Sequence, residues 1–362
     1  QESRTCMKGY MKKNRNRRHV LGVLFLLMLL LIPLQTGAES SPLYVWNGRP
    51  FVVPESSPES YSFLVVGHAY GAPSSVPGFP AATLLGNIAR INNEGAAFLV
   101  LLGDSIEHLD PLTIDRFKEA FSDQIAVPIF SVIGNHEGSE PEFYQQQFGP
   151  SFFQFQYGND LFVFLDSEKD KGRIVGPQLD FLKREIEKLY DRKGPKRLFL
   201  FSHRLLWAVH NPDLREIIPH VNGPIFHLPE MSNVEQDILP LLLKAEPENE
   251  IVWISGDVGL PYSFPLFYHK WKDRNIYFLA TGLGNTPRDA MLKITVPSQG
   301  DITFTPRSLT GQELGPIEHY GMDFWKAYFR KDRHYFRQLL MLSLDLLFRL
   351  GAVISFAIAA AL

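Results

Sequence analysis

The stretch Ala97–Glu137 reads AFLVLLGDSIEHLDPLTIDRFKEAFSDQIAVPIFSVIGNHE, and its pattern decides the fold. Two short apolar runs, Ala97–Leu102 and Val127–Ile133, each stop at a glycine that polar residues follow. Between them, Leu112–Phe121 has the apolar spacing of a helix. Buried strands that alternate with a helix predict a βαβ unit and a mostly parallel sheet.

The same arrangement recurs on both sides of this stretch. The apolar runs Tyr61–Val66, Arg197–Phe201 and Ile251–Ser255 also end at polar clusters. In chain order the five clusters are Gly67-His68-Ala69-Tyr70-Gly71, Gly103-Asp104, Gly134-Asn135-His136-Glu137, Ser202-His203-Arg204 and Gly256-Asp257-Val258-Gly259. Functional side chains gather at the carboxyl ends of parallel strands, so we expect the clusters to form one site.

Other segments have the spacing of helices, strands or hairpins. The expected elements are helices over Ala81–Asn92 and Gln178–Tyr190, a strand over Asn275–Thr281, and hairpins pairing Phe152–Tyr157 with Leu161–Leu165 and Met291–Val296 with Asp301–Phe304. Helices follow from an apolar period of three to four residues, and hairpins from short strands around a polar turn.

The order and spacing of the five clusters resemble the calcineurin-like metallophosphoesterases, a family that includes the purple acid phosphatases. That family carries the blocks Asp-x-His, Gly-Asp, Gly-Asn-His, His and Gly-His-x-His. The second, third and fourth blocks are present here, whereas the first and last differ. The resemblance implies an α/β domain over residues 61–309, a four-layer sandwich of two mixed sheets flanked by helices.

The resemblance also implies a metal site. Its ligands would be Asp104, Asn135 and His203, with Asp257 in place of a family histidine. Aspartate is a competent ligand for divalent Mn, Fe or Zn, so one ion with four protein ligands is expected. The alternative is that no metal is bound, with each of these residues serving the local structure, for example Asp104 as a helix cap.

A second ion has fewer ligands in this sequence. His68, Tyr70 and Gly259 replace the family's ligands, so His68 and Tyr70 are remnants of the second site, and we expect one ion rather than two. His136 matches a family histidine near the leaving group, and it is the candidate catalytic acid. Such a group contributes about 10²–10⁴-fold to a rate.

The composition describes an acidic globular protein. Of 362 residues 45% are apolar, and the single cysteine, Cys6, excludes an intrachain disulfide. Residues 1–38 hold seven basic residues and one acidic residue, and without them the net charge falls from −3 to −9. A strongly acidic chain is a poor partner for nucleic acid, which we therefore do not expect as a ligand.

Both ends of the chain are apolar. In residues 1–38, basic residues precede the apolar run Val20–Ile32 and small residues follow it, which predicts a secretory signal or, alternatively, an uncleaved anchor. Residues 338–362 are nearly all apolar and long enough to cross a bilayer. We expect a membrane helix docked on a partner; an in-plane helix and a helix packed on its own domain are the alternatives.

The expected organisation follows from these segments. After the signal or anchor come an extended lead-in over 39–60, the phosphoesterase-like domain over 61–309 with an insertion at 206–236, a basic and aromatic linker over 310–337, and the membrane-associated helix over 338–362.

Two functions fit the sequence. One is an exported phosphoesterase that has one metal ion and acts on a phosphomonoester or phosphodiester. The other is an inactive relative of such enzymes that serves as a structural or docking subunit of a membrane complex. In both cases the domain is periplasmic or extracellular and membrane-associated.

Overall fold

The computed structural model describes residues 45–54, 58–72, 78–191, 193–209, 211–214, 232–258 and 264–331, which all belong to one compact unit, residues 44–362. The predicted signal or anchor over 1–38, the membrane-associated helix over 338–362 and most of the insertion at 206–236 lie outside the described residues. Among the described residues, no helix combines the length and the apolar character needed to cross a membrane.

The first sheet has five strands in the order β11-β10-β1-β2-β3. These strands are β1 (Ser60–Val66), β2 (Leu99–Leu101), β3 (Ile129–Ser131), β10 (Ala290–Pro297) and β11 (Thr303–Ser308). The strands β1, β2 and β3 are parallel, and the hairpin of β10 and β11 pairs antiparallel to β1. The predicted closing hairpin is thereby confirmed.

The second sheet has six strands in the order β4-β5-β6-β7-β9-β8. They are β4 (Phe153–Tyr157), β5 (Asp160–Phe164), β6 (Arg197–Ser202), β7 (Glu250–Ser255), β8 (Leu266–Lys270) and β9 (Ile276–Thr281). The four central strands are parallel, and β4 and β8 are antiparallel edge strands. The predicted hairpin of β4 and β5 is confirmed, with Gly158 and Asn159 in its turn.

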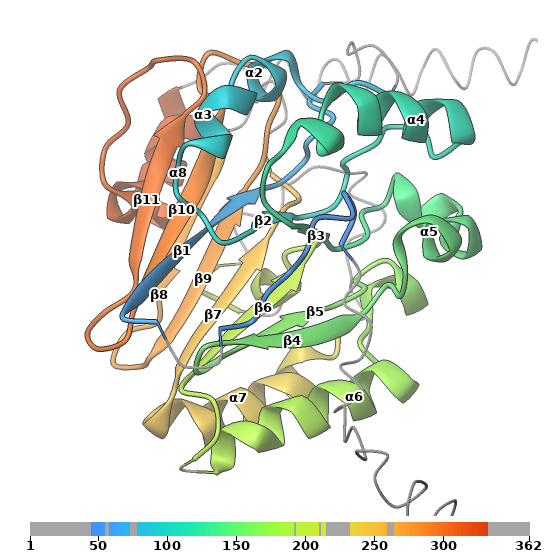
Figure 1. Ribbon diagram of the computed structural model, residues 1–362. Coiled ribbons are helices and arrows are strands. Elements are labelled where there is room, and N and C mark those ends of the chain that lie inside the picture. Colours follow the sequence, from blue (N-terminus) through green and yellow to red (C-terminus); the bar gives the residue numbers. More distant parts are fainter. Residues whose placement is uncertain are drawn as a thin grey trace, which may run out of the picture. The chain divides into compact units, whose positions relative to one another are not determined.

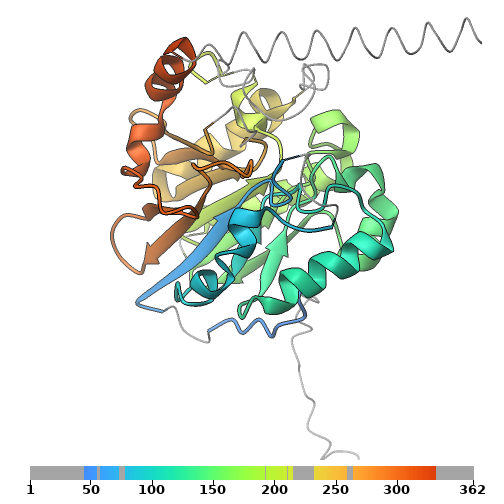
Figure 2. The same ribbon diagram turned by 90° about the horizontal axis from the view of Figure 1, so that it is seen from above.

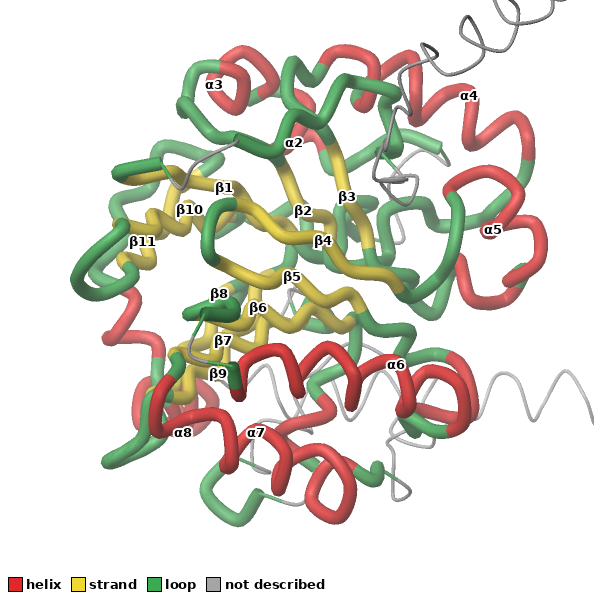
Figure 3. The backbone as a smooth tube through the Cα atoms, turned by 60° about the horizontal axis from the view of Figure 1, so that its bottom comes forward, coloured by secondary structure: helices red, strands yellow, loops and turns green. Residues whose placement is uncertain are grey.

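Helices cover the outer faces of the two sheets. They are α2 (Ala82–Leu85), α3 (Ile88–Asn92), α4 (Pro111–Ala120), α5 (Pro141–Phe148), α6 (Gly176–Glu187), α7 (Leu239–Ala245) and α8 (Met322–Lys331). Figures 1 and 3 show α2, α3 and α4 outside the five-stranded sheet and α6 and α7 outside the six-stranded sheet. The predicted four-layer α/β sandwich of two mixed sheets is therefore confirmed.

Phenylalanine rings fill the space between the sheets. The ring of Phe63 on β1 lies 5.4 Å from Phe162 on β5 and 5.2 Å from Phe199 on β6, measured between centroids. All three side chains are fully buried. Such edge-to-face contacts stabilise a core beyond the area that they bury, and here they join strands from both sheets.

A second core lies under the helices of the first sheet. Leu64 and Leu99 face it from the sheet, and Ile114 and Phe117 face it from α4. Both faces of β1 and β2 are therefore buried, and this explains why their sequences are continuous apolar runs rather than alternating ones.

One predicted helix is divided in the structure. The sequence predicts a helix over Ala81–Asn92, but α2 and α3 are separate, with Gly86 and Asn87 between them. The Asn87 amide donates to the carbonyls of Thr83 and Leu309 at 2.8 Å each. The contact with Leu309 joins residues distant in sequence, so local spacing alone does not predict the break.

The helix α8 occupies part of the segment predicted as a linker. Trp325 is 1% exposed, and its indole N–H donates to the Leu266 carbonyl of β8 at 2.9 Å. In the view from above, α8 is red and lies beside the orange strands (Figure 2). Residues 322–331 therefore pack on the domain rather than leave it.

Candidate active site

The five clusters follow the carboxyl ends of β1, β2, β3, β6 and β7, as the sequence predicts. Loops from the two sheets meet there because glycines permit close contact. A Cβ atom on Gly256 would lie 2.1 Å from the Leu102 carbonyl oxygen, and one on Gly134 would lie 2.2 Å from the Asp104 nitrogen. A side chain at Gly256 would push apart loops of the two sheets, and one at Gly134 would push apart the loops after β2 and β3 of the five-stranded sheet, so the site depends on both glycines.

Asp104 is at the centre of the site. Its carboxylate is 1% exposed, and Oδ2 lies 3.4 Å from His203 Nε2, 3.6 Å from His68 Nε2 and 3.9 Å from His136 Nε2. The other oxygen, Oδ1, accepts the His136 backbone N–H at 3.1 Å. Asp104 has a φ of 51°, a conformation that is uncommon for a residue other than glycine and concentrated at functional sites.

Two of these histidines are held by backbone carbonyls. His203 Nδ1 lies 2.8 Å from the Leu102 oxygen, and His68 Nδ1 lies 3.1 Å from the Leu283 oxygen. In the neutral ring Nδ1–H donates to that oxygen, and the lone pair of Nε2 then faces Asp104. Metal-binding histidines are held in the same way, by donating their other N–H group to a carbonyl or carboxylate.

Two further oxygens face His203 Nε2. The Asn135 amide oxygen lies 3.1 Å away and Oδ1 of Asp257 lies 3.7 Å away. Asp257 Oδ1 is buried, and no described residue forms a hydrogen bond with it. An unpaired carboxylate oxygen is costly to bury, and a cation would satisfy it.

The donor set fits a divalent ion of the Mn, Fe or Zn class, which takes imidazole and carboxylate ligands together. Ligands that share an ion at about 2.0–2.2 Å lie roughly 3–3.5 Å from one another, close to the 3.1, 3.4 and 3.7 Å separations from His203 Nε2. Among the described residues, no group of three or more His, Cys, Asp or Glu side chains is arranged to hold a metal ion. A metal ion bound between these side chains would take the Asn135 amide oxygen as a further ligand.

Burial and neighbouring charges set the pKa values of the site. Burial lowers the pKa of His203, but the carboxylates of Asp104 and Asp257 outweigh it and raise that pKa to about 10. Burial raises the pKa of Asp257 to about 7 although Arg204 opposes it. Burial also raises the pKa of Asp104, but His203 and His68 outweigh it and hold that pKa well below its usual range.

His68 and Tyr70, the predicted remnants of a second site, have different neighbours. Burial lowers the pKa of His68 to about 4, so its ring is neutral near pH 7. The Tyr70 hydroxyl lies 3.1 Å from His136 Nε2. Burial also raises the pKa of Tyr70 above its usual 10, which keeps the phenol protonated. Gly259 lies outside the described residues.

His136 is the most accessible histidine around Asp104. Its side chain is 28% exposed, whereas those of His68 and His203 are fully buried. Its Nδ1 lies 2.8 Å from the Glu107 carbonyl oxygen, so Nδ1–H donates there and Nε2 is the nitrogen that exchanges a proton. This arrangement suits a proton donor at the rim of the site.

Glu137 belongs to the third cluster, and the sequence predicts no role for it. Its carboxylate is fully buried and accepts four backbone N–H groups. Oε2 accepts those of Asp104 and Gly134, both at 3.0 Å, and Oε1 accepts those of Ser105 and Ile106 at 2.6 and 2.9 Å. Glu137 therefore joins the loops after β2 and β3. The only sign of this role in the sequence is that a carboxylate follows a cluster of candidate site residues directly.

Arg204 and Glu168 are two further charged residues that the sequence analysis did not assign. The Arg204 guanidinium binds both Glu168 oxygens, at 2.9–3.1 Å, and lies 3.4 Å from Asp257 Oδ2. The guanidinium thus places a fixed positive charge beside the candidate ligand. Arg204 follows His203 directly in sequence, but Glu168 comes from another loop and no local pattern identifies it.

Comparisons with known proteins test the family resemblance. The sequence model of the calcineurin-like phosphoesterase family matches residues 78–230. That range includes Asp104, Asn135, His136 and His203, and it leaves out the first and last clusters, which depart from the family pattern. No curated protein sequence matches this chain significantly.

Solved structures provide the second comparison. Purple acid phosphatase PPD1 from yellow lupin (Lupinus luteus) seeds has 14% sequence identity and a TM-score of 0.50, over 73% of this chain and 54% of the lupin chain. A dimetal phosphatase from Danio rerio has 15% identity and a TM-score of 0.47, over 69% of this chain and 96% of that chain. This chain thus spans about half the length of the lupin enzyme. The resemblance to the calcineurin-like metallophosphoesterases is confirmed, by sequence over residues 78–230 and by fold for the domain that contains them.

Proposed function

We propose that this protein is a metal-dependent hydrolase of phosphomonoesters or phosphodiesters that uses a single ion. Asp104, Asn135, His203 and Asp257 are the proposed ligands, and the ion is Mn²⁺, Fe²⁺ or Zn²⁺. The observation that carries the proposal is the buried Oδ1 of Asp257, which has no hydrogen bond to any described residue and faces the same imidazole nitrogen as Asp104 and Asn135.

The ion, when bound, would polarise a phosphoryl oxygen and lower the pKa of a water molecule. Backbone contacts hold the side chains of the site in position for that chemistry. The Leu102 carbonyl fixes the ring of His203, and the His136 backbone N–H fixes the carboxylate of Asp104. Arg204 lies close enough to Asp257 to add positive charge where a phosphoryl group would bind.

His136 is the proposed proton donor to the leaving alkoxide. Its Nδ1–H is committed to the Glu107 carbonyl, so a proton carried on Nε2 is the one available for transfer. The Tyr70 hydroxyl can donate to Nε2 when that nitrogen is unprotonated, and this contact orients the ring between turnovers.

A single ion is proposed because the second position lacks ligands. The Tyr70 phenol is protonated and is engaged with His136, and Gly259 carries no side chain. Of these three replacements, His68 is the one whose side chain faces Asp104, with Nε2 3.6 Å from Oδ2.

The second candidate function is an inactive docking subunit, and one observation favours it. His203 and Arg204 place two positive charges against the carboxylates of Asp104 and Asp257. The cluster is therefore stabilised by the protein's own cations, and a metal ion must displace the proton of His203 to bind.

An assay on the purified chain separates the two functions. Turnover of an aryl phosphate with Mn²⁺, Zn²⁺ or Fe²⁺ is expected, and His136→Ala should reduce it by about 10²–10⁴-fold. The exposed His319→Ala provides the control and should keep full activity. No turnover with any metal, together with co-purification of constant partners, would instead identify the docking subunit.

We further propose that the protein is exported and that residues 338–362 attach it to a membrane, where they contact partner subunits. The apolar runs at both ends of the sequence support this. Deleting residues 338–362 should release the domain into the soluble fraction with its fold intact. If the truncated protein stays in membranes after a high-salt wash, residues 1–38 are the anchor.

A further inference from the structure

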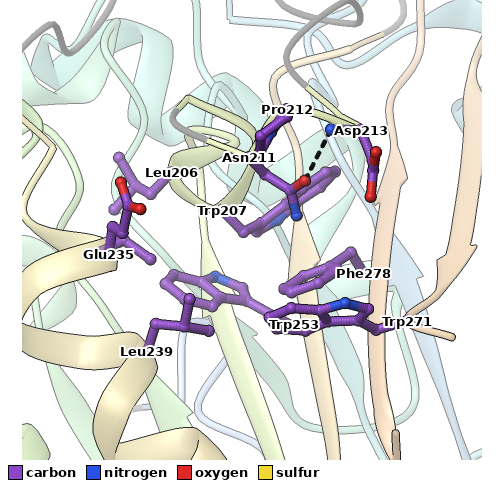
Figure 4. Close-up of a pocket in the computed structure, with 11 residues that line it drawn as sticks. Leu206, Trp207, Asn211, Pro212, Asp213, Glu235, Leu239, Trp253, Trp271 and Phe278 are labelled. Carbon is purple, nitrogen blue, oxygen red and sulfur yellow. Dashed lines mark hydrogen bonds between the residues drawn. The ribbon is translucent and has the colours of Figure 1, made fainter. Parts of the chain in front are cut away.

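An aromatic pocket lies between the six-stranded sheet and the start of α7, and it shares no residue with the candidate active site. Its volume is about 210 Å³. Trp253 on β7 and Phe278 on β9 contribute from the sheet, and Trp207 and Trp271 contribute from segments beside it (Figure 4). Three of the chain's five tryptophans therefore line one cavity.

The two buried indoles direct their polar atoms to protein partners. The Trp207 N–H donates to Ser255 Oγ at 3.0 Å, and the Trp253 N–H donates to Ser202 Oγ at 2.9 Å. Trp207 is 3% exposed and stacks on Phe278, with 5.3 Å between ring centroids. The rings are therefore fixed, and neither indole N–H needs a ligand.

Two carboxylates border the pocket. Asp213 and Glu235 are exposed lining residues, and Figure 4 shows them on opposite sides of the cavity. Within the described residues, neither carboxylate has an ion pair or a hydrogen bond, and no lysine or arginine lines the pocket. The walls offer aromatic faces and the rim offers negative charge, so the electrostatic preference is for a cation.

The pocket also discriminates among cations. The aromatic walls cannot accept the three hydrogen bonds that a primary ammonium loses on leaving water, and the described lining residues offer side-chain acceptors only at Asn211, Asp213 and Glu235. A quaternary ammonium has no N–H donor to satisfy. Trp271 has the Arg274 guanidinium 5.5 Å from its ring centroid, the kind of contact that the electron-rich face of an indole makes with a weakly hydrated cation. Arg274 is not a lining residue and is itself paired with Glu246 at 3.3 Å.

We propose that this pocket binds a quaternary ammonium group, which contacts the partly exposed ring of Trp271 beside the buried rings of Trp207, Trp253 and Phe278 and is attracted by Asp213 and Glu235. The group is either a free solute or the headgroup of a lipid, since both present the same trimethylammonium chemistry. This proposal does not depend on phosphoesterase activity.

Titration of the full chain with choline tests the proposal, because tryptophan fluorescence reports directly on the lining residues. Saturable quenching is expected, and Trp271→Leu should weaken binding about tenfold or more, the loss of one desolvated cation–π contact. Asp213→Asn and Glu235→Gln should each weaken binding and reduce its salt dependence. The exposed Glu248→Gln, which does not line the pocket, is the matched control and should bind like the parent.

The neutral analogue 3,3-dimethylbutan-1-ol separates charge from shape, since it has the same branched end without the cation. Equal affinity for this alcohol would overturn the proposal, as would unchanged choline binding by Trp271→Leu. Vesicles of phosphatidylcholine and of phosphatidylglycerol distinguish the source. If the protein binds phosphatidylcholine vesicles selectively and Trp271→Leu loses that binding, the ligand is a lipid headgroup. If it binds choline but neither kind of vesicle, the ligand is a free solute. If it binds neither choline nor phosphatidylcholine, the proposal is wrong.

Discussion

Glu137 connects the loops that carry Asp104 and Asn135. It is not a candidate ligand, yet its two oxygens accept four backbone N–H groups of the turns after β2 and β3. Single residues of this kind set the positions of the candidate site residues: the Glu137 carboxylate fixes the backbone of two loops, and the carbonyls of Leu102 and Leu283 fix the rings of His203 and His68. Such contacts determine geometry before any ion or substrate arrives.

Replacing Glu137 by Gln should destabilise the domain by roughly 2–5 kcal/mol. The amide has one accepting oxygen, so two of the four backbone N–H groups would lose their acceptor and remain buried. Urea unfolding measures the change. The control is Glu140→Gln, an exposed residue three positions away, which should change the free energy of unfolding by less than about 0.5 kcal/mol. A Glu137→Gln protein as stable as its parent would contradict this account of the loops.

His269 on β8 should make stability depend on pH. Burial lowers the pKa of this histidine although Asp213 opposes it, so the unfolded chain takes up a proton before the folded protein does. The contribution of His269 to the free energy of unfolding is therefore fully present above the pKa of the unfolded state, about 6.5. It is lost as the pH falls through 6.5 toward the lower pKa of the folded state.

Thermal unfolding of His269→Gln beside the parent measures this effect between pH 7.5 and 5. The melting temperature of the parent should fall more steeply than that of the variant, and His319→Gln, at an exposed position, should retain the steep dependence. Parallel curves for parent and His269→Gln would show that the ring is not held neutral by the fold.

At the scale of secondary-structure elements, two side chains cap the N-terminus of α4. The Asp110 carboxylate accepts the backbone N–H groups of Leu112 and Thr113 at 2.9 and 3.0 Å, and the Thr113 hydroxyl accepts that of Asp110. This reciprocal cap precedes Pro111, whose fixed φ suits a first helical turn. The helix then buries Ile114 and Phe117 against β1 and β2.

Replacing Asp110 by Ala should cost about 1–2 kcal/mol of stability, because two N–H groups at the helix start lose their acceptor. Asp115→Ala is the matched control, since Asp115 is exposed on the same helix and makes no cap. Chemical denaturation of both variants is the measurement, and equal losses for the two would contradict the capping role.

At the scale of the whole molecule, the site exists because two sheets bring their loops together. Asp104 and Asn135 follow strands of the five-stranded sheet, whereas His203 and Asp257 follow strands of the six-stranded sheet. Phenylalanines such as Phe63 and Phe199 hold the sheets in this relation from the interior. Mutations in that interlayer core would therefore be expected to disturb the ligands without touching them.

The sequence was sufficient for the βαβ pattern and the strand-end positions, because apolar runs and glycine-led turns are local signals. It did not predict the roles of Glu168 and Arg204, whose contacts join separate loops. Nor did it predict α8. This helix packs through Trp325 on β8, a strand nearly sixty residues earlier in the sequence. The pocket around Trp253 was also missed, since its tryptophans come from separate segments. Contacts of this range depend on tertiary structure and leave no periodicity.

The central claim is that this cluster holds one divalent ion, and metal content after loading is its most direct test. The purified full chain, incubated with Mn²⁺, Fe²⁺ or Zn²⁺ and desalted, should retain about one ion per chain by mass spectrometry of the metal. Asp104→Asn should retain none, and Asp115→Asn, at an exposed position on α4, should match the parent. Two ions per chain, no retained ion in the parent, or equal retention by Asp104→Asn would contradict the claim.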